Sequence, residues 1–267
     1  MQELGEIKVF LLDMDGTINL GGALLPGARD FLEYVKASGR EFLFLTNNSS
    51  KDSQHYVKKM CGLGIACQTG NVLTSGDATI TYLAGKKKEA RVFLLGTPEL
   101  ERDFIRAGFT LTDQAPEFVV LGFDMTLTYE KLVKACDFIR DGVAYIATHP
   151  DLNCPVENGY IPDTGAMIEL IRASTGKMPQ IIGKPNRTII DSAFSRFPGY
   201  ERQAFAMVGD RVYTDIKTGV NAGICSILVL SGESTPEDLD RCGVKASFVF
   251  NGVGDICRSL KEYDAQS

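Results

Sequence analysis

The chain has 267 residues, of which 44% are hydrophobic and 23% charged, and its formal net charge is −6. This is the composition of a folded globular protein, so wholesale disorder is excluded. An acidic chain is a poor candidate for nucleic-acid binding, which depends on lysine and arginine meeting phosphates. The densest basic run, Lys86-Lys87-Lys88, is followed at once by an acid and is interpreted as a solvated surface turn.

The sequence also argues against export and membrane insertion. No apolar stretch approaches the roughly 20 residues needed to span a bilayer. The segment from Met1 to Glu6 carries two acids before the first cation of the chain, whereas a signal or transit peptide is basic and poor in acids. The seven cysteines are scattered and contain no C-x-x-C pair, which is typical of reduced thiols. We therefore expect a cytoplasmic protein that does not associate with a membrane.

The first 60 residues alternate short apolar runs with segments that suit helices. Apolar runs at 7–12 and 42–45 predict buried strands. Segments 26–37 and 53–60 predict helices, the first of them because Pro26 suits an opening helical turn. Strands and helices in alternation predict an α/β fold with a doubly wound parallel sheet.

The rest of the chain shows the same rhythm. The expected strands lie at 91–95, 118–121, 144–148, 180–182, 204–208, 226–230 and 248–250. The expected helices lie at 98–107, 129–140, 165–174, 188–197, 215–221 and 253–261. Turn-rich flanks at 74–77 and 175–179 suit hinges around a middle portion of about 100 residues, enough for an independent α/β unit. We expect a core domain of 1–77 plus 179–267 and an inserted α/β domain of 78–178.

The segment Asp13-Met14-Asp15-Gly16-Thr17 follows directly on the first expected strand. In open α/β sheets, ligands bind beyond the carboxyl ends of the strands. Two carboxylates this close together repel each other unless a cation or a shared proton lies between them. The alternative is a solvated acidic turn in which Gly16 is the turn residue.

Three further polar clusters follow expected strands: Thr46–Ser49, Gly183–Pro185 and Gly209–Asp215. Each alone has an ordinary interpretation as a turn, a helix cap or a surface lysine, and Asp215 suits a first helical turn. We expect all of them at the carboxyl ends of strands in one layer, around one crevice. Hard oxygen ligands with few histidines favour Mg²⁺. A lysine and a hydroxyl beside the metal favour a phosphate ligand.

In order along the chain, D-x-D-G-T, the threonine of Thr-Asn-Asn, Lys184 and Gly-Asp-x-x-x-x-Asp resemble the four motifs of the haloacid dehalogenase superfamily. The segments Leu-Pro-Gly at 25–27, Thr-Asn-Asn-Ser at 46–49 and Gly-Lys-Pro at 183–185 are similar to its NagD-like, para-nitrophenyl phosphatase branch. That branch carries a large α/β (type C2a) cap between the second and third motifs. The resemblance covers nearly the whole chain. It implies a Mg²⁺-dependent phosphatase for small phosphomonoesters, such as sugar phosphates or nucleoside monophosphates.

The resemblance also implies a role for each motif residue. Asp13 is the nucleophile that becomes an aspartyl phosphate, and Asp15 is the general acid and then the general base. The metal ligands are Asp13, the backbone carbonyl of Asp15, and Asp210, whereas Asp215 supports Lys184 or metal-bound water. The residues that bind the phosphoryl group of the substrate are Gly16, Thr46, Asn47 through its backbone N–H, and Lys184.

Specificity is expected in segment 148–165 of the inserted domain, because the corresponding loop of the related family faces the active site. Asp163, Thr164 and Gly165 are expected near the leaving group, with a turn and an N-cap for the next helix as the alternative. His149 is interpreted as a structural residue. The resemblance further suggests a homodimer that forms through the cap.

Two other functions share these motifs. A phosphotransferase or mutase would form the same aspartyl phosphate and pass the phosphoryl group to a sugar instead of to water. A phosphometabolite-binding protein would keep the fold without turnover, but its motifs should be damaged. In this chain Asp13, Asp15, Lys184 and Asp210 are all present. A small phosphorylated metabolite is the expected partner in every case.

Overall fold

The computed structural model describes residues 3–156 and 159–266, which form two compact units. The core unit consists of Met1–Thr46, Gln54–Leu73 and Pro185–Ser267, and the inserted unit consists of Asn47–Ser53 and Thr74–Lys184. These bounds differ from the expected domains, because 47–53, 74–77 and 179–184 group with the inserted unit.

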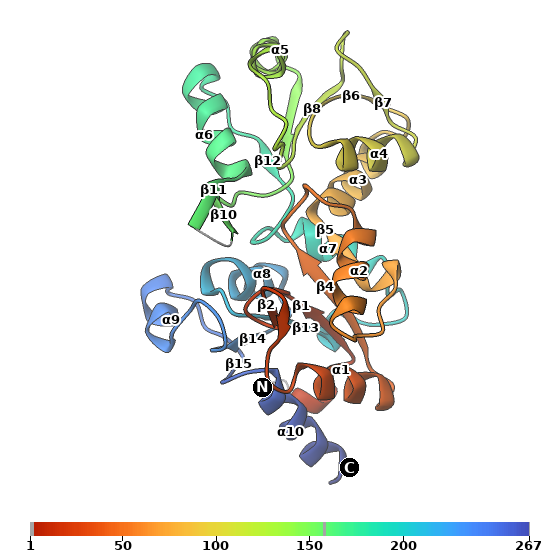
Figure 1. The fold of residues 1–267 in the computed structure, drawn as a ribbon, viewed down its shortest axis with the longest axis vertical. Coiled ribbons are helices and arrows are strands. Elements are labelled where there is room, and N and C mark those ends of the chain that lie inside the picture. Colours follow the sequence, from red (N-terminus) through yellow and green to blue (C-terminus); the bar gives the residue numbers. More distant parts are fainter. Residues whose placement is uncertain (1–2, 157–158, 267) are drawn as a thin grey trace. The chain divides into compact units, whose positions relative to one another are not determined.

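The core unit is built on a six-stranded sheet, visible in the lower half of Figure 1. In sheet order its strands are β15 (Phe248–Phe250), β14 (Cys225–Val229), β13 (Phe205–Gly209), β1 (Val9–Leu12), β4 (Glu41–Thr46) and β5 (Val72–Thr74). β1 pairs in parallel with β13 on one side and with β4 on the other. All four residues of β1 are buried, as expected for a central strand of a parallel sheet. The carboxyl ends of β1 and β13 therefore lie next to each other.

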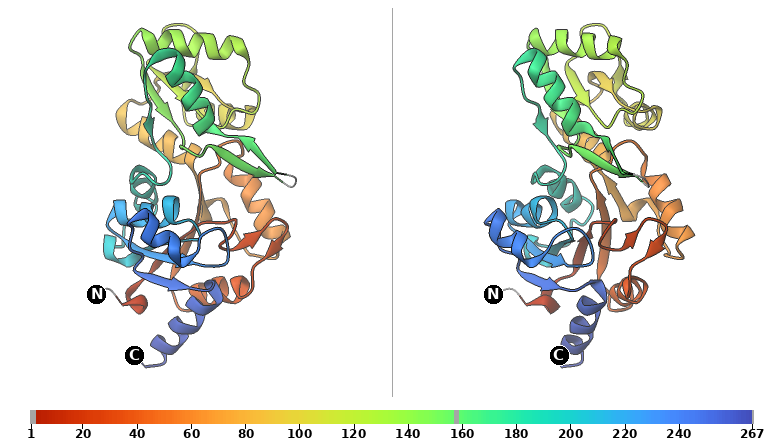
Figure 2. Two further views of the ribbon diagram at one scale, coloured as in Figure 1. Left: turned by 90° about the vertical axis from the view of Figure 1, so that its left-hand side faces the viewer. Right: turned by 60° about the vertical axis from the view of Figure 1, so that its left-hand side comes forward.

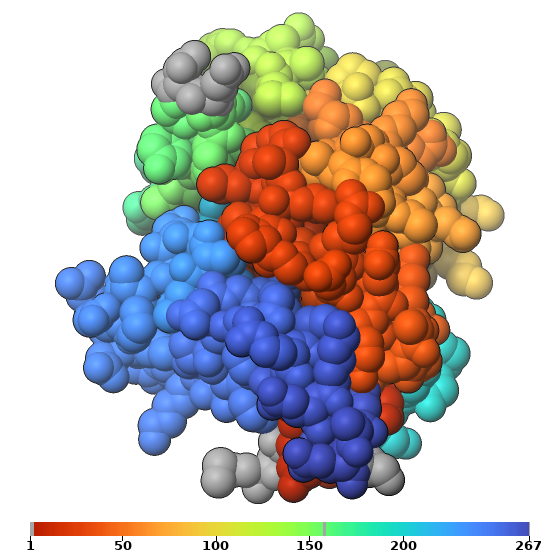
Figure 3. Space-filling view, turned by 60° about the horizontal axis from the view of Figure 1, so that its bottom comes forward, coloured from red at the N-terminus to blue at the C-terminus, as the bar shows by residue number. Residues whose placement is uncertain are grey.

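Helices flank this sheet (Figure 2). They are α1 (Ala28–Ala37), α2 (Ser53–Gly62), α7 (Thr188–Phe194), α8 (Lys217–Ala222), α9 (Pro236–Cys242) and α10 (Val253–Asp264). α1 packs against the sheet through Phe31, whose ring meets Phe10 of β1 edge to face at 5.4 Å. α1 also packs against α10, and Figure 3 shows the dark-blue C-terminal segment beside the red and orange N-terminal one. A short hairpin of β2 (Asn19–Leu20) and β3 (Ala23–Leu24) follows β1.

The inserted unit has a parallel sheet of its own. Its strands, in sheet order, are β12 (Gln180–Ile181), β9 (Ala144–Ala147), β8 (Phe118–Leu121), β6 (Arg91–Leu95) and β7 (Thr110–Leu111). Its helices are α3 (Ser75–Lys86), α4 (Pro98–Arg106), α5 (Tyr129–Arg140) and α6 (Thr164–Thr175). Ile168 and Ile171 of α6 pack with buried residues of α5, β6, β8 and β9 in one hydrophobic cluster. None of the helices within 3–156 and 159–266 combines the length and the apolar character that a membrane span requires.

Two expectations about this unit are wrong. The turn-rich flank at 74–77 begins α3, because Thr74 and Asp77 form a capping box in which each side chain accepts the backbone N–H of the other residue at 3.0 Å. The strand expected at 180–182 does not join the core sheet. It is β12, which pairs with β9 of the inserted sheet through Gln180–Ile146 and Ile181–Ala147. Lys184 thus follows a strand of a different layer from the one that carries Asp13.

The expected specificity segment is more regular than its polar sequence indicates. Residues 153–156 and 159–162 form the antiparallel strands β10 (Asn153–Val156) and β11 (Gly159–Pro162), which lie beside α6 (Figure 2). Residues 157 and 158 of the segment lie outside the described residues, as do Met1 and Gln2 of the N-terminal segment considered above. The helix expected at 215–221 forms in two parts. Residues 215 and 216 belong to a π-helical turn, Val212–Ile216, and the α-helix α8 follows directly after it.

Candidate active site

Three carboxylates meet at the carboxyl ends of β1 and β13. Asp13 follows β1 directly, and its backbone N–H continues the ladder by donating to the carbonyl of Val208 at 2.9 Å. Asp210 follows β13, and Asp215 lies in the π-helical turn after it. One carboxylate oxygen from each of these three residues lies within 4.8 Å of the others. Asp13 and Asp210 thus lie together in the structure, as their places after expected strands predict. Asp215 joins them, although the family resemblance had given it a supporting role.

The carboxylate of Asp210 is closely packed and hydrogen-bonded. It accepts the backbone N–H of Glu233 at 2.8 Å and lies 3.4 Å from the hydroxyl oxygen of Thr17. A Cβ atom built on Gly16 or on Gly232 would collide with this carboxylate, and Gly16 also has a φ of +91°. Both glycines are thus required by close approach, and Gly16 also by its backbone conformation. Burial, followed by the charge of Asp215, raises the pKa of Asp210 to about 6.

This cluster suits a divalent cation. Asp210 is 2% exposed and Asp215 is 0% exposed, so bulk water does little to separate their charges. Three carboxylates with no histidine among them form a hard oxygen donor set, of the kind that binds Mg²⁺, Ca²⁺ or Mn²⁺. Because mutual repulsion raises the energy of the metal-free cluster, bound positive charge would stabilise it.

Asp15 does not share this environment. Its carboxylate is largely exposed and accepts the side-chain amide of Asn19 at 2.6 Å and the ammonium of Lys59 at 2.9 Å. Asn19 lies in β2 and Lys59 in α2, both in the core unit. The first motif therefore sends its two carboxylates into different surroundings: Asp13 joins the acidic cluster, and Asp15 meets a cation and an amide.

The second motif divides between the two units. Thr46 ends β4 of the core unit, whereas Asn47 is the first and Lys184 the last residue of the inserted unit. The Asn47 side chain accepts the backbone N–H of Lys184 at 2.8 Å and donates to the backbone carbonyl of Lys184 at 3.0 Å. The same amide lies 3.2 Å from both carboxylate oxygens of Asp151. A Cβ on Gly183 would lie 2.6 Å from the Asn47 side-chain oxygen, so only glycine lets the chain pass here.

Replacing Asn47 with alanine is expected to lower the free energy of unfolding by about 2–4 kcal/mol. The substitution removes the partner that satisfies both backbone polar groups of Lys184, which is only 3% exposed. Chemical denaturation measures the change. Asn153→Ala, at an exposed asparagine of the same unit, is the matched control and should change stability by less than about 0.5 kcal/mol. Equal changes in the two variants would contradict the structural importance of Asn47.

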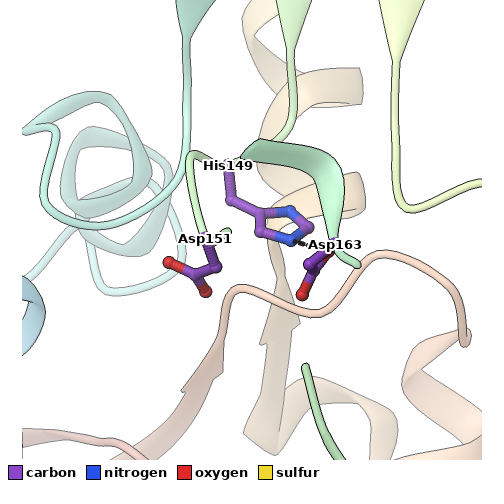
Figure 4. A group of neighbouring side chains, drawn as sticks. All are labelled: His149, Asp151 and Asp163. Carbon is purple, nitrogen blue, oxygen red and sulfur yellow. Dashed lines mark hydrogen bonds and ion pairs between the residues drawn. The ribbon is translucent and has the colours of Figure 1, made fainter. Parts of the chain in front are cut away.

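A second group of acids and a histidine lies in the inserted unit (Figure 4). The ring of His149 is fully buried; its Nε2 lies 2.9 Å from Asp163 Oδ1, and its Nδ1 lies 2.9 Å from the Thr148 hydroxyl oxygen. Asp163 also accepts the backbone N–H of Thr164 at 2.6 Å as the N-cap of α6. These hydrogen bonds agree with the interpretation of His149 as structural. They also show Asp163 as a helix cap, whereas a position near the leaving group stays a prediction.

The sequence interpretation overlooked several contacts of the core site. Neither the amide of Asn19 nor the ammonium of Lys59 was assigned to Asp15. The segment Ser231–Ser234 was also not singled out, although Ser231 donates to the Gly16 carbonyl at 2.8 Å and the Glu233 N–H binds Asp210. The strand-end rule could have predicted these contacts, because this polar segment follows β14, the neighbour of β13 in the sheet.

Comparison with known proteins identifies the class to which this arrangement belongs. Residues 10–110 match a family model described as haloacid dehalogenase-like hydrolase, and residues 181–256 match a second model described as HAD-hydrolase-like. The acid sugar phosphatase of Staphylococcus aureus (strain MRSA252) is 34% identical over 258 residues, which cover 96% of this chain and 99% of that protein. The chain therefore belongs to the haloacid dehalogenase-like hydrolases.

Solved structures narrow the class to one branch. A 4-nitrophenylphosphatase from Thermotoga maritima is 48% identical with a TM-score of 0.92, over 96% of this chain and 98% of that one. NagD from E. coli K-12 is 30% identical with a TM-score of 0.87, over 93% and 98% of the two chains. The chain is thus a member of the NagD-like, para-nitrophenyl phosphatase branch, which confirms the resemblance drawn from its motifs and the α/β fold class.

Proposed function

We propose that this protein hydrolyses small phosphomonoesters through an aspartyl phosphate formed on Asp13. Its reaction class, phosphoric monoester hydrolysis, is that of the branch to which it belongs. The observation that carries the proposed mechanism is the position of Asp13 within 4.8 Å of two further carboxylates, at the carboxyl ends of β1 and β13. That edge of an open α/β sheet is where such proteins bind their ligands.

In the first step, a carboxylate oxygen of Asp13 forms a bond to phosphorus while the bond from phosphorus to the leaving oxygen breaks. The leaving oxygen takes the electron pair of that bond and a proton from Asp15. In the second step, water attacks the aspartyl phosphate and gives a proton back to Asp15. Inorganic phosphate leaves, and the carboxylate of Asp13 is restored. Dividing the displacement into two steps, each with proton transfer by a positioned carboxyl group, lowers the barrier.

We propose Mg²⁺ as the cation of the acidic cluster, held by the side chains of Asp13 and Asp210 and by the backbone carbonyl of Asp15. Asp215 is either a further ligand or a support for the others. When bound, the ion neutralises negative charge on the transferring phosphoryl group. The residues themselves fit a small hard cation, since they offer oxygen atoms alone and Asp210 is fixed by two glycines and the Glu233 N–H.

The remaining site residues keep the roles that the resemblance assigns to them. Thr46, the backbone N–H of Asn47 and the ammonium of Lys184 bind the phosphoryl oxygens, where positive charge and donors stabilise the transition state. Gly16 lies in the loop beside this group, and its own N–H donates to the carbonyl of Asn19. The contacts of Asn47 with Lys184 support this proposal, because they fix the backbone that carries the ammonium.

Sugar phosphates are the first substrate class to consider, since a relative that matches over nearly the whole chain is named an acid sugar phosphatase. We assign substrate selection to segment 78–178 as a cap domain. A cytoplasmic location and a homodimer that forms through this cap complete the proposal.

The test is phosphate release from para-nitrophenyl phosphate, measured with Mg²⁺ and with a chelator in its place. Release that requires the metal is expected, followed by activity on a panel of sugar phosphates. A balance of products completes the test: inorganic phosphate must equal nitrophenol. With a free sugar added as acceptor, a deficit of phosphate matched by a phosphorylated sugar would instead indicate a phosphotransferase. Lack of nitrophenol release under every metal condition, on this substrate and across the panel, would contradict the proposal.

A further inference from the structure

Both contacts of the Asp15 side chain go to the same carboxylate oxygen. The amide nitrogen of Asn19 lies 2.6 Å from Oδ1, and the ammonium nitrogen of Lys59 lies 2.9 Å from it. A carboxylate has two oxygens of equal chemistry, so two donors on one of them define its orientation and leave the other for a different partner.

The Asn19 amide is well placed to orient this carboxylate. Asn19 is fully buried, and its amide nitrogen faces two acceptors, Asp15 Oδ1 and the carbonyl of Gly21 at 3.3 Å. Two acceptors identify that atom as the nitrogen, since an oxygen there would repel both. Its backbone is fixed as well: the carbonyl of Asn19 accepts the N–H of Gly16 at 2.7 Å. The Asn19 amide therefore belongs to the same loop as Asp13, the proposed nucleophile.

Lys59 approaches from a separate element. It lies in α2, whose buried residues Tyr56 and Met60 turn this face of the helix toward the core, and its side chain is 26% exposed. The neighbouring Lys58 is exposed. The Asp15 side chain is 58% exposed, but a second donor on the same oxygen restricts this carboxylate more than a single exposed ion pair would.

We propose that Asn19 and Lys59 are positioning residues that occupy Oδ1 of Asp15, so that Oδ2 exchanges the proton with the leaving group and with water. This inference rests on the proposed function, in which Asp15 is the general acid and base. Asn19 and Lys59 act through Asp15, because their side chains contact its carboxylate and the loop that carries it.

A positioning role predicts a dependence on the leaving group that a general loss of structure does not produce. A nitrophenolate leaves readily without a proton, whereas an alkoxide does not. The constant kcat/KM reports the enzyme up to the first irreversible step, the release of the leaving group. Misplacement of Asp15 should therefore reduce kcat/KM for alkyl phosphates strongly and for para-nitrophenyl phosphate only slightly.

The experiment measures kcat/KM for a series of substituted phenyl phosphates and for one alkyl phosphate, in the Mg²⁺-loaded full chain. Lys59→Met keeps the apolar stem and removes the donor, and Asn19→Ala removes the amide. For each variant we expect a loss of about 10-fold or more on the alkyl phosphate and about twofold or less on para-nitrophenyl phosphate. Lys59→Arg should restore most of the loss, and Lys58→Met is the matched control without effect.

Asp15→Asn separates this inference from the proposed function. If Asp15→Asn shows the strong leaving-group dependence but Lys59→Met and Asn19→Ala lose activity equally on all substrates, or lose none, the positioning role is wrong and the general acid stands. If Asp15→Asn itself loses activity equally on all substrates, the assignment of Asp15 as the acid is wrong, and the positioning role falls with it. Thermal unfolding of each variant confirms that it is folded under the assay conditions.

Discussion

Replacing Asp13 with asparagine is expected to reduce kcat on the order of 10⁴-fold or more without unfolding the protein. Asparagine has nearly the same shape as aspartate, but its amide is a poor nucleophile toward phosphorus. The backbone contact of Asp13 with Val208 does not involve the side chain, so β1 should keep its place in the sheet. Phosphate release from para-nitrophenyl phosphate gives the rate, and circular dichroism with thermal unfolding reports the fold.

The specificity of this result can be tested at another aspartate. Asp240 is exposed in α9 of the same unit, and Asp240→Asn should retain full activity. Acid-quenched protein should carry labelled phosphate in the wild type and none in Asp13→Asn. Near-normal turnover in Asp13→Asn, or label retained by that variant, would place the nucleophile elsewhere.

The second large effect concerns stability in the absence of metal. The pKa of Asp210 is raised to about 6 in the folded protein, by burial and then by the charge of Asp215, from an ordinary value of 3.8. Between about pH 4 and pH 6 the folded state therefore holds a proton that the unfolded state has lost, and the free energy of unfolding falls as the pH rises through this window. Above it, the charged carboxylate destabilises the metal-free fold by about 2–3 kcal/mol.

Asp210→Asn should therefore increase the stability of the chelator-treated protein at pH 8 and have little effect at pH 4, because asparagine carries no charge to bury. Mg²⁺ should stabilise the wild type at pH 8 by binding to the folded state, and should stabilise the variant far less. Activity should be lost in the variant. Chemical denaturation at the two pH values, with and without metal, checks all of these outcomes. A variant that is less stable than the wild type at pH 8 without metal would contradict the electrostatic account.

The core fold is predictable from sequence because its strands are strongly apolar. The run at 42–45 predicts β4 to within one residue at each end. α3 is not predicted, since Ser75, Gly76 and Thr79 lower its intrinsic helix propensity and the capping box at Thr74 resembles a turn in sequence. The helix forms because Ala78 and Leu83 are buried by tertiary packing. The sheet to which β12 belongs is not predictable either, because a strand of two residues carries no pattern that distinguishes one parallel sheet from another.

Some features of the candidate site are likewise predictable from the sequence, and others are not. Proximity of Asp13 and Asp210 follows from their places after neighbouring strands. The two donors to Asp15 depend on the rotation of α2 about its axis and on the turn before β2, which motif spacing does not determine. The 3.6-residue period that buries Tyr56 and Met60 could have favoured Lys59 over Lys58, but it says nothing about which acid the lysine meets. Binding of phosphate by Gly16, Thr46, Asn47 and Lys184 stays a prediction.

The central position of β1 has a consequence for biosynthesis. One edge of β1 pairs with β4, which leaves the ribosome soon afterwards, but its other edge pairs with β13, and nearly 200 residues separate the two along the chain. Throughout that interval the nascent core exposes an unpaired apolar strand, the kind of edge that promotes aggregation. Asp13 likewise has no Asp210 beside it until about four-fifths of the chain has been made. We therefore expect the nascent chain to depend on chaperone protection late into translation, and the acidic cluster to assemble as one of the last events of folding.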